Sequence, residues 1–196
     1  EAHDAGYTQV LWLDGVEQKY VEEVGAMNIF FVIDDELIPP MLSGSILPGI
    51  TRASVLELGR AWGLKVSERK ISIDEVVNAH ASGHLKEIFG SGTAAVISPV
   101  GELKYEDTLI TVGDGQVGPL AHKFFQAIQD IQLGDAHASD AIDLQRTFQR
   151  HGIQPAASTL STGGGAELMP LLPEILADLV AHVAGQVVHQ FRRERT

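Results

Sequence analysis

The segment at residues 47–52, LPGITR, places a hydroxyl group where a helix is expected to begin. After Gly49, apolar residues recur at spacings of three and four, which predicts a helix over residues 51–63 with one buried face. The first turn of a helix carries unpaired N–H groups and a partial positive charge, so it favours an anion such as a phosphate. Thr51 could cap this helix or help to bind a phosphate, and the segment alone favours the ordinary cap.

Glu23 is a second candidate, in the stretch VEEVGAMNIFFV at residues 21–32. The small residues Gly25 and Ala26 follow it, and then an apolar strand. A carboxylate that enters an apolar strand is costly unless a cation meets it. The protonated ring nitrogen of a bound cofactor would be such a cation. A solvent-exposed carboxylate at the end of the strand is the alternative, and this stretch alone favours it.

A third candidate is the stretch FGSGTAAVISPV at residues 89–100. Its small residues from Gly90 to Thr93 predict a turn that enters a strand. Such a turn lets the backbone approach a ligand closely and directs amide and hydroxyl groups into one concave surface. The glycines could equally serve only a tight bend, so this stretch alone does not decide between the two.

Together, the three stretches and their neighbours resemble one family. The shared motifs include QVLWLDG, EEVGAMNIFFV, SGSILPGITR, SERKISIDEV, FGSGTAAVISPVGEL and GPLAHKFFQAI, in this order over about residues 1–134. They resemble the large, C-terminal domain of branched-chain amino acid aminotransferases, which are fold-type IV pyridoxal phosphate enzymes. The motif EVGAMN separates this family from D-amino-acid aminotransferases and aminodeoxychorismate lyases. The resemblance implies an α/β (α+β) fold and pyridoxal 5′-phosphate as the cofactor.

The resemblance also implies roles for individual residues. Cofactor contacts would come from Glu23, Leu47, Ile50, Thr51, Gly92 and Thr93, and substrate contacts from Ala26, Ala94 and Ala95. An acid at the position of Glu23 keeps the pyridine nitrogen protonated, so that the ring can accept electrons when the substrate loses its α-proton. Leu47 would pack against the ring. The helix start at Ile50 and Thr51, together with Thr93, would hold the phosphate.

The implied reaction moves the amino group of leucine, isoleucine or valine to 2-oxoglutarate and gives glutamate and a branched 2-oxo acid. Members of the family are typically homodimers. The sequence does not decide the preference among the three amino acids, because part of the substrate pocket would belong to the small N-terminal domain of the family.

The lysine that binds the cofactor covalently in this family belongs to a motif that would precede Glu1. None of the lysines of the chain lies in a matching context, and the small N-terminal domain has no counterpart in the sequence. A chain without that amine lacks the nucleophile of the reaction. We therefore expect a fragment that is incomplete at its N-terminus and inactive as a transaminase alone.

The elements that must position these residues follow from the hydrophobic pattern. Strands are predicted at residues 8–13, 26–34, 65–72, 93–100 and 108–112, and helices at residues 51–63, 73–81 and about 118–131. The predicted aminotransferase domain covers residues 1–134. Residues 135–165 favour a linker because they are rich in alanine and turn residues, and residues 166–196 favour a helical tail with an apolar stripe.

The tail at residues 166–196 is not explained by the resemblance. Glu174 and Asp178 interrupt its apolar stripe, which favours a packing surface over a membrane helix. The chain could come from a truncated or misjoined gene. It could also be a non-catalytic remnant or interaction protein that associates through the tail, and the sequence leaves these alternatives open.

The composition limits the partners of the chain. The net charge of −12 at pH 7 argues against a nucleic-acid partner, because phosphate binding requires clustered Lys and Arg. No cysteine occurs, which excludes disulfides and thiolate nucleophiles and suits a cytoplasmic protein. No stretch is long and apolar enough to predict a membrane span. His137, His151, His182 and His189 are too scattered to predict a metal site.

Overall fold

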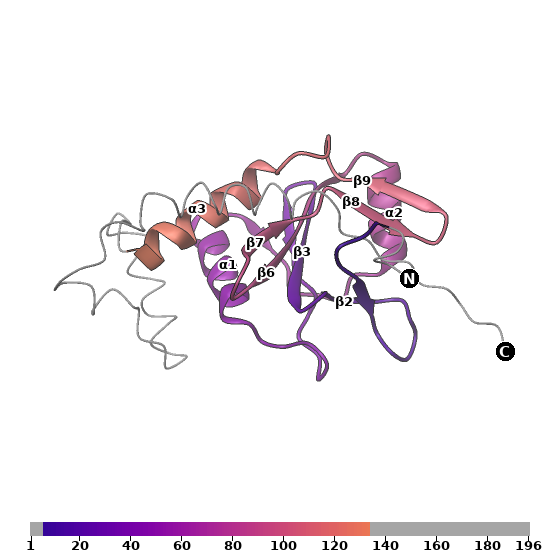
Figure 1. Ribbon diagram of the computed structural model, residues 1–196, viewed down its shortest axis with the longest axis horizontal. Coiled ribbons are helices and arrows are strands. Elements are labelled where there is room, and N and C mark those ends of the chain that lie inside the picture. The colour runs from indigo at the N-terminus through magenta and orange to yellow at the C-terminus, as the bar shows by residue number, and fades with distance from the viewer. Residues whose placement is uncertain (1–5, 134–196) are drawn as a thin grey trace.

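Residues 6–133 are the part of the chain that this computed structural model describes (Figure 1). The predicted linker at residues 135–165 and the predicted tail at residues 166–196 lie outside the described residues. Within residues 6–133, no helix is long and apolar enough to cross a membrane. The described residues thus cover the predicted aminotransferase domain apart from its two ends.

The centre of the fold is strand β3, which belongs to a seven-stranded sheet. The strands of this sheet are β1 (Leu11–Leu13), β2 (Val21–Val24), β3 (Met27–Ile33), β4 (Glu36–Ile38), β5 (Lys65–Val66), β6 (Leu85–Gly92) and β7 (Val96–Pro99). On one edge β3 pairs with β6, and on the other it pairs with β2 near its start and with β4 near its end. All pairs are antiparallel except β4 with β5. Strands β8 (Glu102–Tyr105) and β9 (Thr108–Thr111) form a separate hairpin.

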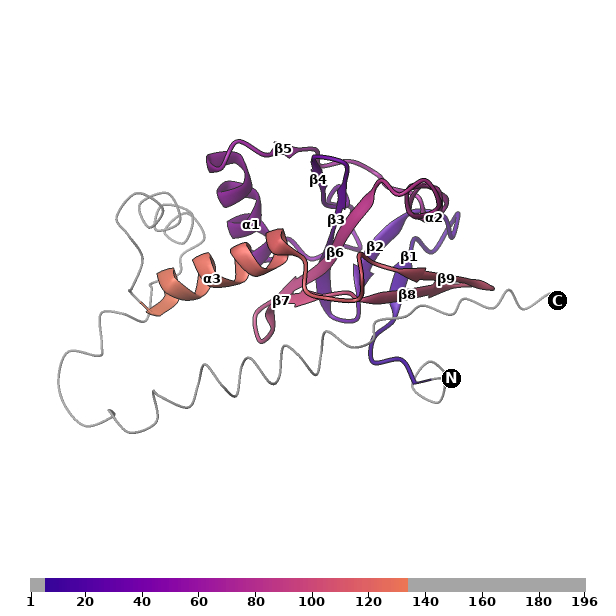
Figure 2. The same ribbon diagram turned by 90° about the horizontal axis from the view of Figure 1, so that it is seen from above.

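Both faces of the sheet are covered, and this explains why β3 is apolar without alternation. Phe30 and Val32 belong to a core cluster with helices α1 (Ile50–Ala61) and α3 (Pro119–Leu133). Ile29 and Phe31 belong to a second cluster with helix α2 (Ile73–Ala81) and the β8–β9 hairpin. Figures 1 and 2 show α1 and α3 on one side of the sheet and α2 on the other. Successive side chains of β3 therefore point into different cores.

The predicted helices are confirmed with small changes at their ends. Residues 73–81 form α2 as predicted, and Ser72 caps this helix by accepting a hydrogen bond from the amide of Glu75 at 3.1 Å. Helix α1 ends at Ala61 and not at residue 63, and α3 extends to Leu133. Amphipathic patterns of this length define a helix strongly, whereas its last residues depend on local caps.

The predicted strands differ more from the observed ones. The predicted strand at residues 65–72 is wrong after Val66, because residues 67–70 run as an irregular segment beside β4 with one isolated bridge from Arg69 to Pro40. The predicted strand at 93–100 begins only at Val96. The pattern does not predict β6, whose sequence LKEIFGSG contains two glycines and two charged residues. Residues such as these are depleted from strands in general, and pairing with β3 overrides that preference here.

Candidate functional site

A row of polar side chains crosses the sheet near the start of helix α1. Glu23 on β2 lies opposite Asn28 on β3, and Asn28 lies opposite Ser91 on β6. Opposite residues on neighbouring antiparallel strands point to the same face. Asn28 and Phe30 are two residues apart in β3, so their side chains point to the same face of the sheet. This is the face that α1 and α3 cover. The side chains of Glu23, Asn28 and Ser91 therefore form a polar border along one end of the hydrophobic core on this face.

Glu23 is half-buried, and one of its two carboxylate oxygens is already engaged. Its Oε1 accepts a hydrogen bond from the amide of Leu47 at 3.2 Å and a longer one from Nδ2 of Asn28 at 3.4 Å. Its Oε2 accepts none from residues 6–133. Glu23 is the third of the four residues of β2 and lies opposite Trp12 on β1 and Asn28 on β3. One oxygen fixes the side chain, and the other remains available to a ligand.

The start of helix α1 is open to an anion. Its N-cap is Gly49, which makes no side-chain cap, and its first turn has no acidic residue. The alternative in which Thr51 caps the helix is therefore wrong: Thr51 is the second helical residue, and its Oγ1 lies 3.4 Å from the carbonyl oxygen of Gly92. Uncapped amides and the helix dipole make such a start attractive to a phosphate.

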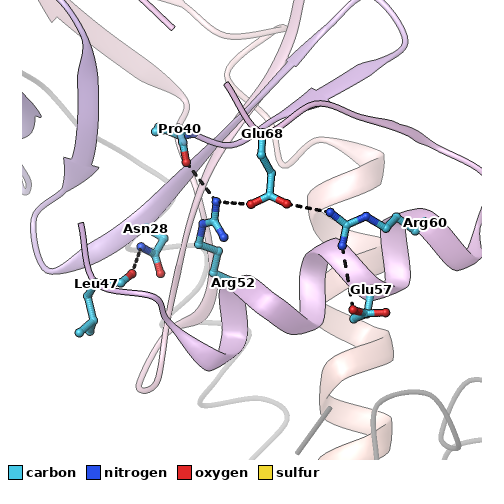
Figure 3. A network of polar contacts seen from close by, with 7 residues as sticks. All are labelled: Asn28, Pro40, Leu47, Arg52, Glu57, Arg60 and Glu68. Atoms are coloured by element: carbon cyan, nitrogen blue, oxygen red, sulfur yellow. Dashed lines mark hydrogen bonds and ion pairs between the residues drawn. The ribbon is translucent and has the colours of Figure 1, made fainter. Parts of the chain in front are cut away.

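Gly49 is required by a close approach to the sheet. A Cβ atom at this position would lie 2.3 Å from Oδ1 of Asn28. Nδ2 of Asn28 donates a hydrogen bond to the carbonyl oxygen of Leu47 at 2.8 Å, so the segment before α1 is held on β3 (Figure 3). Only a residue without a side chain leaves room for this contact.

The third stretch forms its turn later than the sequence predicts. Gly90, Ser91 and Gly92 continue β6, and the turn consists of Thr93, Ala94 and Ala95. Met27 packs over both glycines: a Cβ atom would lie 3.1 Å from Met27 Cε at Gly90 and 3.0 Å from Met27 Cγ at Gly92, so a larger residue would require Met27 to shift. Three of the four residues of the expected turn at 90–93 therefore form the end of β6, and only Thr93 lies in the turn.

The turn ends in a strained residue. Val96 has a φ of 56°, a left-handed conformation that is rare for a β-branched residue and costs about 1–3 kcal/mol. Thr93 and Ala94 are exposed, and Ala95 is half-buried. Because the carbonyl of Gly92 lies beside Thr51, this strained turn begins next to the helix start. Strain of this kind is often found at ligand-binding sites.

The structure thus brings most of the predicted site residues together. Hydrogen bonds link Glu23 to Leu47 and Thr51 to Gly92, Ile50 is the first residue of α1, and the turn at 93–95 continues from Gly92. Leu47 is 69% exposed, so its side chain is free to cover a ligand. Ala26 is exposed in the turn between β2 and β3, and no described side-chain contact ties it to the others.

Sequence reasoning missed three buried polar residues near the site. Asn28 is 5% exposed, Ser91 1% and Arg52 4%. The hydroxyl of Ser91 has no hydrogen-bond partner among the described residues. A signal existed for two of them, because Asn28 interrupts an apolar strand and Arg52 follows Thr51 in the first turn of a helix. Buried polar groups need partners, so such positions indicate a network.

Arg52 fixes the first turn of α1 from the side away from Asn28. Its Nη2 donates to the carbonyl of Pro40 at 3.1 Å and to Oε2 of Glu68 at 2.9 Å (Figure 3). Arg60 donates to Oε1 of the same carboxylate at 2.8 Å. Partial burial would raise the pKa of Glu68, but the hydrogen bonds and charges of Arg52 and Arg60 outweigh it and lower that pKa below its ordinary value.

Other features of the described residues lie apart from this site. A cleft of about 290 Å³ lies between the β1–β2 loop and the segment after β4, with Asp14, Tyr20, Met41 and Lys70 in its lining, and it includes none of the predicted site residues. Within residues 6–133, no group of three or more His, Asp or Glu side chains is arranged to hold a metal ion.

Comparisons with known proteins show the family of this chain. Residues 1–103 match the family model for amino-transferase class IV. The branched-chain-amino-acid transaminase 1 of Bacillus subtilis (strain 168) is 60% identical over 134 residues, which are 68% of this chain and 38% of that protein. The chain therefore spans about two fifths of the length of the curated relatives it matches.

Solved structures show the same likeness. The branched-chain amino acid aminotransferase from Escherichia coli matches with a TM-score of 0.57 and 32% identity, over 70% of this chain and 42% of that one. The branched-chain aminotransferase from Thermoproteus uzoniensis with norvaline matches with a TM-score of 0.58 and 28% identity, over 71% of this chain and 41% of that one. Another similar branched-chain amino acid aminotransferase was solved with pyridoxamine 5′-phosphate.

Proposed function

Because the chain belongs to the class IV aminotransferase family, we propose that residues 6–133 form the cofactor-binding part of a branched-chain amino acid aminotransferase. The complete enzyme would move an amino group from leucine, isoleucine or valine to 2-oxoglutarate. The observation that carries this proposal is the junction of Glu23 with the segment that opens α1, through the amide of Leu47. The backbone segment that leads into α1 thus contacts the acid at Leu47 and, three residues later, begins the helix proposed to bind the phosphate.

The residues present fit pyridoxal 5′-phosphate on three counts. Oε2 of Glu23 has no partner among the described residues and can accept from a protonated ring nitrogen. The start of α1 has neither a side-chain cap nor an acidic residue, which suits a phosphate. Gly49 keeps this start close to the strand that positions the acid.

Each residue would then have a limited task. When bound, the cofactor supplies an electron sink for the α-carbon of the substrate. Glu23 would hold a proton on the ring nitrogen, and Leu47 would cover the ring and exclude water. The amides of Ile50 and Thr51 would bind the phosphate, with Gly92 and Thr93 beside them. Alanine side chains at positions 26, 94 and 95 would leave the neighbouring amides accessible to a substrate carboxylate.

We further propose that the 196 residues alone do not complete the catalytic site. Five of the six described ammonium groups have partners elsewhere: Lys19 and Lys70 lie over Tyr20, Lys65 pairs with Glu36, Lys86 donates to Gly83, and Lys123 lies over Trp62. The sixth, Lys104, lies on β8 in the separate β8–β9 hairpin. Borohydride treatment of the chain with pyridoxal 5′-phosphate should therefore give no stoichiometric cofactor adduct on a single lysine of residues 6–133. A stoichiometric adduct on one of them, located by peptide mass spectrometry, would contradict this.

The complete enzyme is proposed to be a homodimer in the cytoplasm. The resemblance to the family supports the dimer, and the absence of cysteine suits a reducing compartment.

Binding of pyridoxamine 5′-phosphate tests the proposed site directly, because this ligand needs no covalent bond. We expect Glu23→Gln and Thr51→Ala each to lower its affinity by about tenfold, the effect of one hydrogen bond to a charged group. Glu22→Gln is the matched control, since Glu22 precedes Glu23 in β2 and instead accepts from Ser45 at 2.5 Å. Isothermal calorimetry measures the affinities. Equal affinities for all four proteins would reject the site.

A further inference from the structure

We propose that Asn28 is a positioning residue that couples the carboxylate of Glu23 to the phosphate-binding start of helix α1. Through this coupling, one amide side chain sets both the protonation of a bound pyridine ring and the hold on its phosphate. The inference rests on the function proposed above and adds a residue to it.

The contacts of Asn28 join the two halves of the site. Its Nδ2 donates to the carbonyl oxygen of Leu47 at 2.8 Å and to Oε1 of Glu23 at 3.4 Å. The amide of Leu47 in turn donates to the same Oε1 at 3.2 Å. Glu23, Asn28 and Leu47 therefore form a closed three-membered network in which each residue contacts the other two.

The burial of Asn28 fixes which oxygen of Glu23 is left for a ligand. Asn28 is 5% exposed, so its side chain cannot exchange these partners for solvent without cost. Both hydrogen bonds to Glu23 end on Oε1, which leaves Oε2 as the atom that can meet a ligand. Two donors on one oxygen thus select the ligand-facing oxygen of Glu23.

The same side chain also fixes where α1 begins. A Cβ atom at residue 49 would lie only 2.3 Å from Oδ1 of Asn28, so the backbone at Gly49 passes directly over the Asn28 side chain. The carbonyl of Leu47 that Asn28 binds lies two residues before this N-cap. Without Asn28, Leu47 would lose the contact that holds its carbonyl to β3, and its amide would no longer be held against Glu23.

Arg52 provides a contrast that the experiment can use. It anchors the first turn of α1 through Pro40 and Glu68 (Figure 3), and neither contact involves Glu23 or Asn28. Loss of Arg52 should loosen the helix start and leave the acid in place. Loss of Asn28 should affect both.

The experiment uses the full chain and pyridoxamine 5′-phosphate labelled with ¹⁵N in its ring. The ¹⁵N chemical shift distinguishes a pyridinium from a neutral pyridine, and it is measured at a pH at which the free ligand has lost its ring proton. For the wild-type chain we expect the pyridinium signal. For Asn28→Leu, which keeps the size but removes the amide, we expect the neutral signal and an affinity lower by about tenfold or more.

Arg52→Gln is the control for general loosening. It should weaken binding or lower stability while the bound ligand keeps the pyridinium signal. The inference is overturned, and the proposed function survives, if Asn28→Leu retains the pyridinium signal or if Arg52→Gln loses it as well. If the wild-type chain does not bind the ligand, the proposed site fails and the inference fails with it.

A second variant covers the case in which Asn28→Leu does not fold. Asn28→Asp keeps the shape and polarity but replaces the donor with an acceptor that faces both the Leu47 carbonyl and Glu23. Folding of each variant is checked by its amide NMR spectrum. We expect Asn28→Asp to bind pyridoxamine 5′-phosphate at least about tenfold more weakly than the wild type. Wild-type affinity in this variant would overturn the inference.

Discussion

Gly49 and Asn28 show how a single atom can determine a residue type. The sequence presents Gly49 as part of a Pro-Gly break, which any turn could explain. The structure shows instead that Asn28 Oδ1 occupies the space of its side chain. The glycine is therefore a consequence of the polar residue on β3, which lies 21 positions earlier in the chain.

Gly49→Ala should destabilise the chain by about 1–3 kcal/mol, because the added methyl group forces the α1 start away from β3. Gly44→Ala is the matched control in the same connection, since nothing lies within 4 Å of a Cβ atom there. Urea unfolding measures both variants. A Gly49→Ala chain as stable as Gly44→Ala would show that the close approach is not required.

Asp14 is a residue whose charge supports a loop. Its carboxylate accepts from the amides of Tyr20 and Lys19 at 2.8 and 2.9 Å, and from those of Glu17 and Val16 at 2.6 and 3.1 Å. These hydrogen bonds, that of Tyr20 first, lower the pKa of Asp14 far below its ordinary value of 3.8.

A lowered folded-state pKa gives a definite pH dependence. The stabilisation from Asp14 is complete above its unfolded-state pKa and is lost as the pH falls from there toward the lower folded-state pKa. Asp14→Asn should therefore reduce stability at about pH 7 and lose less stability between about pH 5 and pH 2 than the wild type. Urea unfolding across this range measures the difference. Parallel pH profiles would show that the Asp14 charge has no such role.

Helix α3 depends on a carboxylate from a distant strand. Glu87 on β6 is 7% exposed, and its two oxygens accept from the amides of Leu120 and Ala121 at 2.9 and 2.8 Å. Gly118 leaves the necessary space, because a Cβ atom there would lie 2.1 Å from Glu87 Cδ. The negative charge also complements the positive end of the helix dipole. The helix start that a Gly-Pro pair predicts is thus completed by a side chain that the local sequence does not contain.

Glu87→Gln should cost about 1–2 kcal/mol, because a neutral amide has one acceptor where the carboxylate has two and does not favour the helix dipole. Glu57→Gln is the control, since Glu57 is 39% exposed and its ion-pair partner, Arg60, lies 4.0 Å away. We expect a change of less than about 0.5 kcal/mol for the control. Similar values for the two variants would contradict a capping role for Glu87.

Across the domain, an aromatic chain joins the sheet to two helices. The rings of Phe30 and Phe89 stack with centroids 5.1 Å apart, Phe89 lies 5.8 Å from Phe124 of α3, and Phe124 stacks on Trp62 at 4.8 Å. Phe30, Phe89 and Phe124 are fully buried. Because Asn28 and Ser91 lie on the same face as this chain, the packing that holds α1 and α3 also supports the candidate site.

Phe89→Ala should destabilise the domain by about 3–5 kcal/mol, the usual cost of a large cavity in a core. Phe31→Ala removes an equally buried ring from the other face and should cost a similar amount. The two differ in what they loosen: amide hydrogen exchange should speed up in α1 and α3 for Phe89→Ala and in α2 for Phe31→Ala. The same pattern in both variants would show that the two cores are not separate.

The sequence was sufficient for the helices and the family, because periodic apolar residues and short motifs are local signals. It predicted α2 to the residue and grouped Glu23, Leu47 and Thr51 in one candidate site. It did not predict β6, the cap from Glu87 or the role of Asn28. Each of these depends on residues far apart in the chain that come into contact only when the sheet forms. The stabilisation from such long-range contacts leaves no local pattern in the sequence.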